Sequence, residues 1–167
     1  DKEKLKLNNS ISINDYGCGY GALIGYLFNR GIKISDYNGY DISKEMTEKL
    51  KSQYLREYEN KRVKVFNNDT ISTLADYSII SGTFNVKFKE SNKKWHQFIL
   101  EKLKEINLHS KKGFSFNLLS TYVDWQESHL YYGDPNFWFD FCKKNFSKKI
   151  ALLHDYPLFE FTIVVRK

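Results

Sequence analysis

ISINDYGCGYG, residues 11–21, predicts a strand, a glycine-rich loop and the start of a helix. Its first four residues alternate between apolar and polar, as a short half-buried strand does. Asp15 follows, and then three glycines at alternate positions. Apolar residues recur at helical spacing over residues 22–28, and Gly31 ends that run. Because glycine has no Cβ, such a loop brings bare backbone close to a ligand, and the helix behind it offers unpaired N–H groups.

A second feature follows about twenty residues later, where a nucleotide-binding fold places an acid that binds ribose. The chain reads YNGYDIS there, with Asp41 at the end of a second predicted strand and Ser43 as a suitable N-cap for the next helix. A carboxylate at that edge can accept hydrogen bonds from both ribose hydroxyls. The glycine loop alone would also suit an ordinary strand-to-helix turn, and the acid favours a nucleotide site.

These two stretches resemble the first two motifs of the class I S-adenosylmethionine (SAM)-dependent methyltransferases. DYGCGYG is similar to D/E-x-G-x-G-x-G, in which the acid orients the loop and the methionine amino group. YDIS is similar to the second motif, whose acid binds the ribose. A nicotinamide dinucleotide site favours G-x-G-x-x-G, but Ala22 could replace its third glycine, so the spacing alone leaves both families open.

The end of the chain separates the two families. Two apolar strands, residues 149–154 and 160–165, are joined by a turn containing Pro157, and so short a link makes them antiparallel neighbours. A nicotinamide domain of this class ends in a parallel strand. Between these features we expect strands at 63–66, 76–81 and 114–119, and helices at 20–29, 43–59, 93–108 and, after the Asp134–Pro135 cap, up to residue 146.

The resemblance implies one methyltransferase domain over residues 1–167. Its expected architecture is a three-layer α/β/α Rossmann-like fold with a seven-stranded, mostly parallel sheet and a C-terminal antiparallel hairpin. Residues 1–10 are polar and are expected to be an irregular lead-in or the tail of a missing helix. The chain begins at Asp1 and not at a methionine, which leaves room for residues missing before it.

The resemblance also implies SAM as cofactor and assigns residues to its site. Asp69 follows the third strand, where the family contacts the adenine amino group; an ordinary Asn/Asp turn is the alternative. The fourth strand ends in SGTFNV and not in the N/D-P-P-Y/F of amino-directed nucleic-acid methyltransferases, which disfavours methylation of a base nitrogen. The predicted cofactor residues are Asp15, Gly17, Cys18, Gly19, Gly21, Asp41, Ile42, Met46, Asp69, Ser81 and Gly82.

A long irregular stretch, STYVDWQESHLYYGDP at residues 120–135, is expected to cover the acceptor of the methyl group, since connections of this length are often functional. Its aromatic residues could instead simply pack on the next helix. A base would assist a hydroxyl acceptor. His129, His154 and Asn85 are the candidates for catalysis, whereas His96 and His109 are expected to be exposed. Methyl transfer of this kind needs no metal.

Charge and composition bound the function further. The net charge is +6, but the lysines form scattered pairs, which favours a solvated surface over a nucleic-acid patch. No apolar run is long enough to span a membrane, and two cysteines without a C-x-x-C pair fit a reducing cytoplasm. We expect methyl transfer to an oxygen of a small molecule or glycan unit, because SGTFNV and the C-terminal stretch resemble methyltransferases of bacterial surface-polysaccharide pathways. The alternatives are an RNA-directed methyltransferase, a non-catalytic SAM-binding partner and, more distantly, a nicotinamide oxidoreductase.

Overall fold

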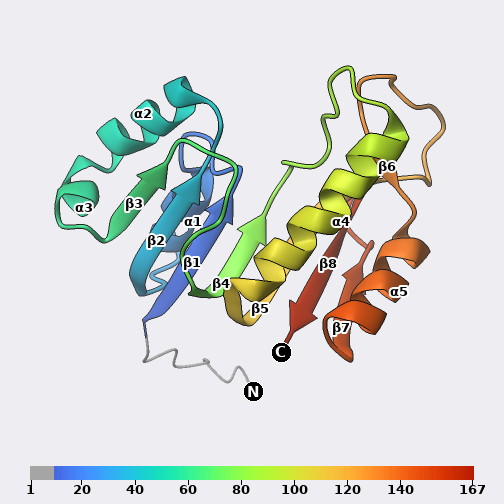
Figure 1. Ribbon diagram of the computed structural model, residues 1–167. Helices are drawn as coiled ribbons and strands as arrows, with labels where there is room; N and C mark the ends of the chain where they lie inside the picture. Colours follow the sequence, from blue (N-terminus) through green and yellow to red (C-terminus); the bar gives the residue numbers. More distant parts are fainter. Residues whose placement is uncertain (1–9) are drawn as a thin grey trace.

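One mixed sheet forms the centre of the computed structural model, which describes residues 10–167; the predicted lead-in lies outside them except for Ser10. The strand order is β3-β2-β1-β4-β5-β8-β7 (Figure 1). The strands up to β5 are parallel, and β8 and β7 close the sheet as an antiparallel hairpin. Their bounds are β1 Ile11–Tyr16, β2 Ile34–Tyr40, β3 Val63–Phe66, β4 Ala75–Ile80, β5 Ser110–Ser120, β7 Lys149–Leu153 and β8 Glu160–Arg166. The predicted fold class and hairpin are confirmed.

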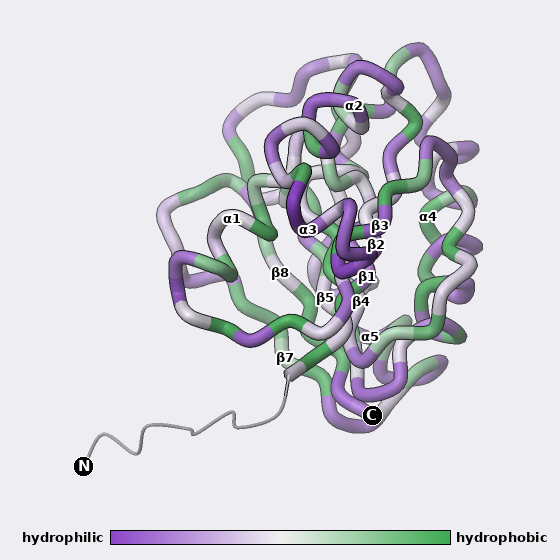
Figure 2. Tube along the Cα trace, turned by 90° about the vertical axis from the view of Figure 1, so that its left-hand side faces the viewer, coloured by the Kyte–Doolittle hydropathy of each residue, from purple (hydrophilic) through white to green (hydrophobic). Residues whose placement is uncertain are grey.

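Helices cover the sheet on two sides, as Figure 2 shows with α1 and α4 on opposite sides of the strands. On one side α1 (Ala22–Asn29) and α2 (Lys44–Gln53) contribute Ile24, Leu27 and Leu50 to one buried cluster. On the other side α4 (Asn92–Leu108) and α5 (Pro135–Asn145) cover a larger one. No helix among residues 10–167 is long and apolar enough to cross a bilayer.

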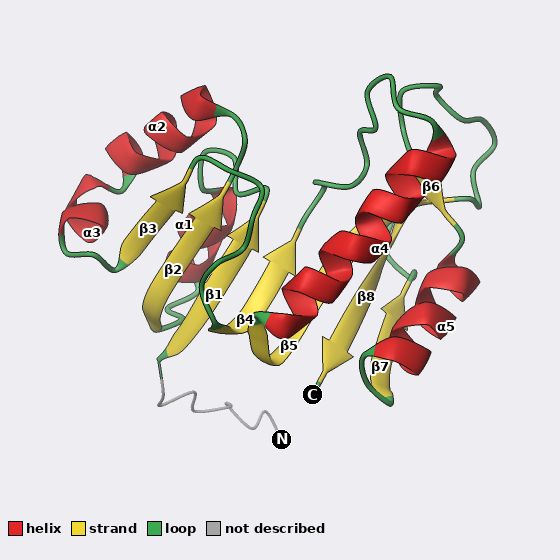
Figure 3. Ribbon diagram, viewed as in Figure 1, coloured by secondary structure: helices red, strands yellow, loops and turns green. Residues whose placement is uncertain are grey.

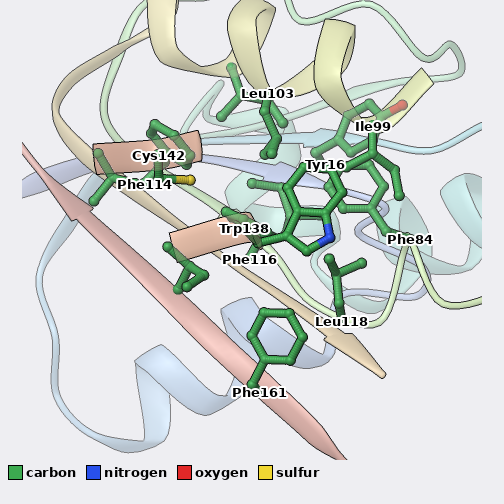
Figure 4. Close-up of a cluster of buried hydrophobic side chains, with 14 of the residues drawn as sticks. Tyr16, Phe84, Ile99, Leu103, Phe114, Phe116, Leu118, Trp138, Cys142 and Phe161 are labelled. Atoms are coloured by element: carbon green, nitrogen blue, oxygen red, sulfur yellow. The ribbon is translucent and has the colours of Figure 1, made fainter. Parts of the chain in front are cut away.

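The larger cluster lies between the middle of the sheet and helices α4 and α5 (Figure 4). Alternate residues of β5 and β8 point into it, including Phe116 and Phe161, while Ile99 and Trp138 come from the helices. Each fully buried side chain of this size stabilises the fold by roughly 1.5–3 kcal/mol relative to an exposed one. This core packs against β4 and β5, whose last paired residues are Ile80 and Phe116, so β5 extends four residues beyond the end of β4.

The helix predicted over residues 43–59 is instead two helices, α2 and α3 (Leu55–Glu59), which meet at Tyr54. Tyr54 leaves helical geometry, with φ −118° and ψ 41°. Its hydroxyl donates to the Gly21 carbonyl at 3.4 Å, and its ring packs edge-on against Phe28. The break therefore lets Tyr54 pack under the glycine loop, a tertiary contact that local helical spacing does not reveal.

Two further boundaries differ from expectation. Helix α1 begins at Ala22 and not at Tyr20, because Gly21 has φ 92° and serves as its N-cap. Strand β5 begins at Ser110, before the predicted Phe114, because Gly113 continues the strand where a Cβ would meet the Val165 carbonyl oxygen at 2.1 Å. The irregular stretch also contains an eighth, two-residue strand, β6 (Tyr132–Gly133), parallel to β5.

Candidate active site

A cavity of about 300 Å³ opens at the carboxyl ends of the parallel strands, where ligands bind in open α/β sheets. A larger groove, about 530 Å³, lies on the surface along β3 and α3, and no predicted cofactor residue lines it. Five of the predicted cofactor residues line the strand-end cavity: Gly17, Asp41, Ile42, Asp69 and Gly82. The sequence analysis did not assign the other eight, which are Tyr16, Tyr40, Asn68, Thr83, Val86, Phe88, Trp95 and Phe98.

The glycine loop is fastened to its neighbours through backbone contacts. The N–H groups of Gly17 and Cys18 both donate to the Tyr40 carbonyl, at 2.8 and 3.1 Å. A Cβ on Gly17 would lie 2.0 Å from Thr83 Oγ1, and that hydroxyl donates to the Tyr16 carbonyl at 2.9 Å. Gly17 therefore lets the loop after β4 pack directly on the glycine loop.

Asp41 joins the two sequence motifs. One carboxylate oxygen accepts the Gly19 N–H at 2.9 Å, and the other accepts the Ser43 N–H at 2.8 Å. Strand β2 ends at Tyr40, so Asp41 stands just beyond it. Each carboxylate oxygen can accept more than one hydrogen bond. Asp41 can therefore hold the loop and still accept from hydroxyls in the cavity.

The residues present fit the nucleoside of SAM. A Cβ on Gly19 (φ 51°) or Gly82 (φ 73°) would have no neighbour within 4 Å, so both glycines face open space. The side chains of Val86, Phe88, Trp95 and Phe98 also line the cavity, and such apolar and aromatic surfaces suit a flat base. The charged groups in the lining are the carboxylates of Asp41 and Asp69, and no Lys or Arg belongs to it. A cationic sulfonium suits such a lining, whereas the pyrophosphate of a dinucleotide would face two like charges.

A buried lysine supports the loop that carries Asp69. Lys102 on α4 is 7% exposed, and its ammonium donates to the Asp69 carbonyl at 2.6 Å and to Glu105 at 2.7 Å. Glu105 also accepts the Ile71 N–H at 2.6 Å, and Lys102 Nζ lies 5.2 Å from the centre of the Tyr16 ring. This pair therefore holds the loop between β3 and β4 at Asp69 and at Ile71. The sequence analysis assigned no role to Lys102, although Leu103 and Ile106, which are buried on the same helix, were a usable signal for its position.

Two predicted cofactor residues, Asp15 and Cys18, have buried side chains and do not belong to the cavity lining. Asp15 is 3% exposed and accepts the Tyr37 hydroxyl, and burial raises the pKa of this carboxyl to about 7. Cys18 packs against Gly39, and burial raises the pKa of its thiol, which keeps it protonated. A cofactor contact by either side chain stays a prediction.

The remaining predicted cofactor residues have local contacts. Gly21 packs against Tyr54 at the start of α1. The backbone N–H of Met46 donates to the Ser43 hydroxyl that caps α2, and the side chain is exposed. Ser81 is exposed directly after β4. Their roles toward a cofactor stay predictions as well.

The three catalytic candidates do not line the cavity. The amide oxygen of Asn85 accepts the Leu119 N–H at 3.0 Å, so this side chain links the loops after β4 and β5. His129 is exposed, and its carbonyl accepts the Lys87 N–H. His154 is exposed beside the Tyr122 ring. Their catalytic roles stay predictions.

The expectation that His96 and His109 are exposed was wrong. Both rings are partly buried, and each makes a hydrogen bond: His96 Nδ1 with the Tyr131 hydroxyl at 2.6 Å, and His109 Nδ1 with the Glu105 carbonyl at 2.9 Å. Burial lowers the pKa of His96. His96 therefore ties α4 to Tyr131, whereas His109 contacts the last turn of α4 itself, as its C-cap.

A second cavity, of about 190 Å³, lies within the predicted acceptor segment. Leu130 lines it, and Leu130 pairs in an antiparallel bridge with Val86, which lines the first cavity. Figure 3 shows the two connected loops rising beyond the carboxyl ends of β4 and β5. The cavity is lined by Leu119, Val123, Asp124, Trp125, Glu127, Leu130, Tyr132 and Phe159.

A polar chain crosses the sheet between the two cavities. The Gly82 N–H donates to the Asn117 amide oxygen at 2.7 Å, and the Asn117 amide nitrogen donates to Glu160 at 2.8 Å. Glu160 pairs with Leu119 across β5 and β8 and directly follows Phe159, so it lies beside the second cavity. The sequence analysis treated Glu160 only as the first residue of a strand.

Comparisons with known proteins agree on this architecture. The chain is 47% identical over 159 residues to "Putative methyltransferase Rv1506c" of Mycobacterium tuberculosis (strain ATCC 25618 / H37Rv), covering 94% of this chain and 93% of that protein. No protein-family model matches.

Solved structures share the fold at low identity. The magnesium protoporphyrin IX methyltransferase of Synechocystis PCC 6803 with bound SAH aligns with TM-score 0.70 at 13% identity, over 95% of this chain and 75% of that one. The methyltransferase domain of bacterial CtHen1-C aligns with TM-score 0.69 at 13% identity, over 96% and 91%.

Proposed function

The chain belongs to the class I SAM-dependent methyltransferases, and from that premise we propose that it transfers the methyl group to an oxygen of a small molecule or glycan unit. The observation that carries the proposal is the cavity at the ends of β1, β2 and β4, where the Asp41 carboxylate meets the Gly19 N–H. A second cavity beside it, lined by residues from the stretch 119–132 together with Phe159, gives an acceptor a place next to the cofactor.

SAM, when bound, supplies an activated methyl group on a sulfonium that is its own leaving group. The protein then has to position the reactants and exclude water. We assign the ribose hydroxyls to Asp41, and the flat base to the wall formed by Phe88, Trp95 and Phe98. The open backbone at Gly19 and Gly82 leaves room for the rest of the cofactor.

The choice of oxygen rests on the residues after β4. Ser81–Asn85 lack the motif of enzymes that methylate a base nitrogen, and Asn85 is engaged in holding Leu119. An oxygen acceptor needs a group that takes its proton. Glu160 lies beside the second cavity, and Asn117 contacts one of its carboxylate oxygens, so we add Glu160 to His129 and His154 as candidates for this role.

An RNA-directed methyltransferase is the second candidate, because the net charge of +6 would attract a polyanion. The lysine pairs are nevertheless exposed at separate places, and several lysines have acidic partners, such as Lys112 with Asp76 and Lys144 with Asp140. A non-catalytic SAM-binding protein is the third. The two buried free cysteines, Cys18 and Cys142, support the proposal of a reducing compartment.

The experiment that separates these candidates is a screen with methyl-labelled SAM. Purified protein is incubated with phenols, simple glycosides, aliphatic amines and total RNA, and label is followed into each fraction. Label entering phenols or glycosides at oxygen supports the proposal. Label entering only RNA would favour an RNA-directed methyltransferase. Label entering only amines would rule out oxygen as the methylated atom.

A further inference from the structure

The cavity of about 190 Å³ lies next to the end of the cofactor cavity that faces β5. Leu130 lines the smaller cavity, and its bridge partner Val86 lines the cofactor cavity. Lys87 N–H donates to the His129 carbonyl at 3.0 Å and the Tyr131 N–H donates to the Asn85 carbonyl at 2.9 Å, which fastens the two loops together. The loops after β4 and β5 therefore form a common wall between the two cavities, which are neighbours.

The smaller cavity suits one ring. Its walls are mainly apolar or aromatic, and at about 30 Å³ per water its volume corresponds to roughly six waters. Trp125 and Phe159 are 68% and 65% exposed, so two large apolar surfaces stand open at this cavity. Exposed aromatic surface beside a pocket is typical of a binding site.

The lining of the smaller cavity is negatively charged, whereas the chain as a whole is positively charged. Asp124 and Glu127 are its charged residues, although the protein as a whole carries +6. Neither forms an ion pair with any residue of the described range 10–167. Lys87, on the adjoining loop, is engaged by the carbonyls of Glu90 and Ser128 and does not belong to the lining.

Tyr132 adds a polar group of fixed position. Its hydroxyl oxygen accepts the Glu127 N–H at 3.1 Å, which leaves the hydroxyl proton free to be donated into the cavity. The lining thus offers carboxylate acceptors, one hydroxyl and aromatic faces, and it offers no cation.

From these observations we propose that the cavity between Trp125 and Phe159 is the acceptor subsite and takes a single ring that carries no negative charge. Asp124 and Glu127 accept from ring hydroxyl or ammonium groups and repel carboxylate and phosphate. This inference rests on the proposed function for its biological meaning, but its ligand preference can be measured without any transfer reaction.

The test uses three ring probes of matched size: benzyl alcohol, which is neutral, benzylamine, which is cationic at pH 7, and benzoate. Each is titrated into the protein in the presence of SAH while the three indole N–H signals are followed by NMR, with Trp125→Phe identifying the Trp125 signal. SAH binding is measured separately by calorimetry, so a failure of the proposed function is seen on its own.

Benzyl alcohol and benzylamine should shift the Trp125 signal to saturation, and benzoate should bind about five- to tenfold more weakly, because two exposed like charges oppose it. Asp124→Asn with Glu127→Gln should remove most of that difference, whereas Asp140→Asn on α5 should leave it intact. Equal binding of benzoate, a shift of Trp95 in place of Trp125, or no shift with any probe would overturn the proposal.

Discussion

The backbone N–H of Gly19 donates to the Asp41 carboxylate at 2.9 Å, across 22 positions of the chain. Gly19 belongs to the loop after β1, and Asp41 follows β2 directly. Because β1 and β2 are parallel neighbours, both residues stand at the same edge of the sheet. The hydrogen bond fixes the shape of the glycine loop before any ligand arrives, so the site is largely organised in advance.

Gly19→Val should abolish SAM binding and leave the protein folded. The Cβ direction at Gly19 opens into free space beside Asp41, so a branched side chain would occupy ligand volume, and φ 51° adds strain of about 1–2 kcal/mol. Calorimetry measures the binding, and thermal unfolding measures the strain.

Gly31→Val is the matched control. Gly31 also has a positive φ, 68°, and open space at its Cβ, but it lies after α1 and away from the cavity. Its variant should lose similar stability and bind SAM as the wild type does. Normal SAM binding by Gly19→Val would reduce the loop to a simple turn.

Stability should depend on pH through Asp15. Burial raises its folded pKa from 3.8 to about 7. Between these values the folded state keeps a proton that the unfolded state has lost, so the free energy of unfolding falls as pH rises, by up to roughly 4 kcal/mol in total. Below pH 3.8 Asp15 is protonated in both the folded and the unfolded state, so it no longer makes the free energy of unfolding depend on pH.

Asp15→Asn should therefore flatten the decline in stability between pH 4 and 7, which urea unfolding at several pH values measures. Asparagine retains an acceptor for the Tyr37 hydroxyl without the titrating charge. Asp36→Asn at the partly exposed start of β2 should keep the wild-type slope. An unchanged slope in Asp15→Asn would show that this carboxyl titrates normally.

Lys102→Met should destabilise the protein by about 2–4 kcal/mol, since Glu105 would be left without its buried partner while remaining partly exposed to water. SAM affinity should also fall, because the Asp69 carbonyl loses its donor. Adding Glu105→Gln should recover about 1 kcal/mol or more in a double-mutant cycle. Strictly additive losses would mean that the two side chains are not coupled.

RNA should bind weakly and without being methylated. The lysine pairs are dispersed, whereas a true polyanion site loses about three to five decades of affinity between 50 and 200 mM salt. Fluorescence anisotropy with labelled RNA across that salt range measures both quantities. Sub-micromolar, salt-sensitive binding together with methyl transfer to the RNA would replace the proposed function by its alternative.

Most of the fold could be predicted from the sequence because the patterns that indicate its strands, helices and turns are local. Glycines beside a strand, caps such as Ser43 and Asp134, and a short link between two apolar strands each depend on neighbouring residues, and both caps accept as expected. The break at Tyr54 escaped prediction because its cause is a contact with Gly21, 33 positions away.

The walls of the site were less predictable for the same reason. Gly17 and Asp41 belong to recognisable motifs, but Trp95 and Phe98 reach the cavity only because α4 packs across the sheet there. Lys102 had no assigned role in the sequence analysis, and its burial follows from helix packing. The proposed role of Glu160 could not be predicted from the sequence, because it depends on the hydrogen bonds through Asn117 that connect Glu160 to Gly82.

Calorimetric titration of SAM into the wild type, Asp41→Ala and Asp36→Ala tests the central claim most directly. Both aspartates belong to the β2 region, but only Asp41 lines the cavity. The wild type and Asp36→Ala should bind with a Kd in the micromolar range, about −8 kcal/mol. Asp41→Ala should lose about 1.5–3 kcal/mol, the contribution of a charged hydrogen bond. Equal affinity in all three proteins, or no binding by the wild type, would contradict the assignment of this cavity to SAM.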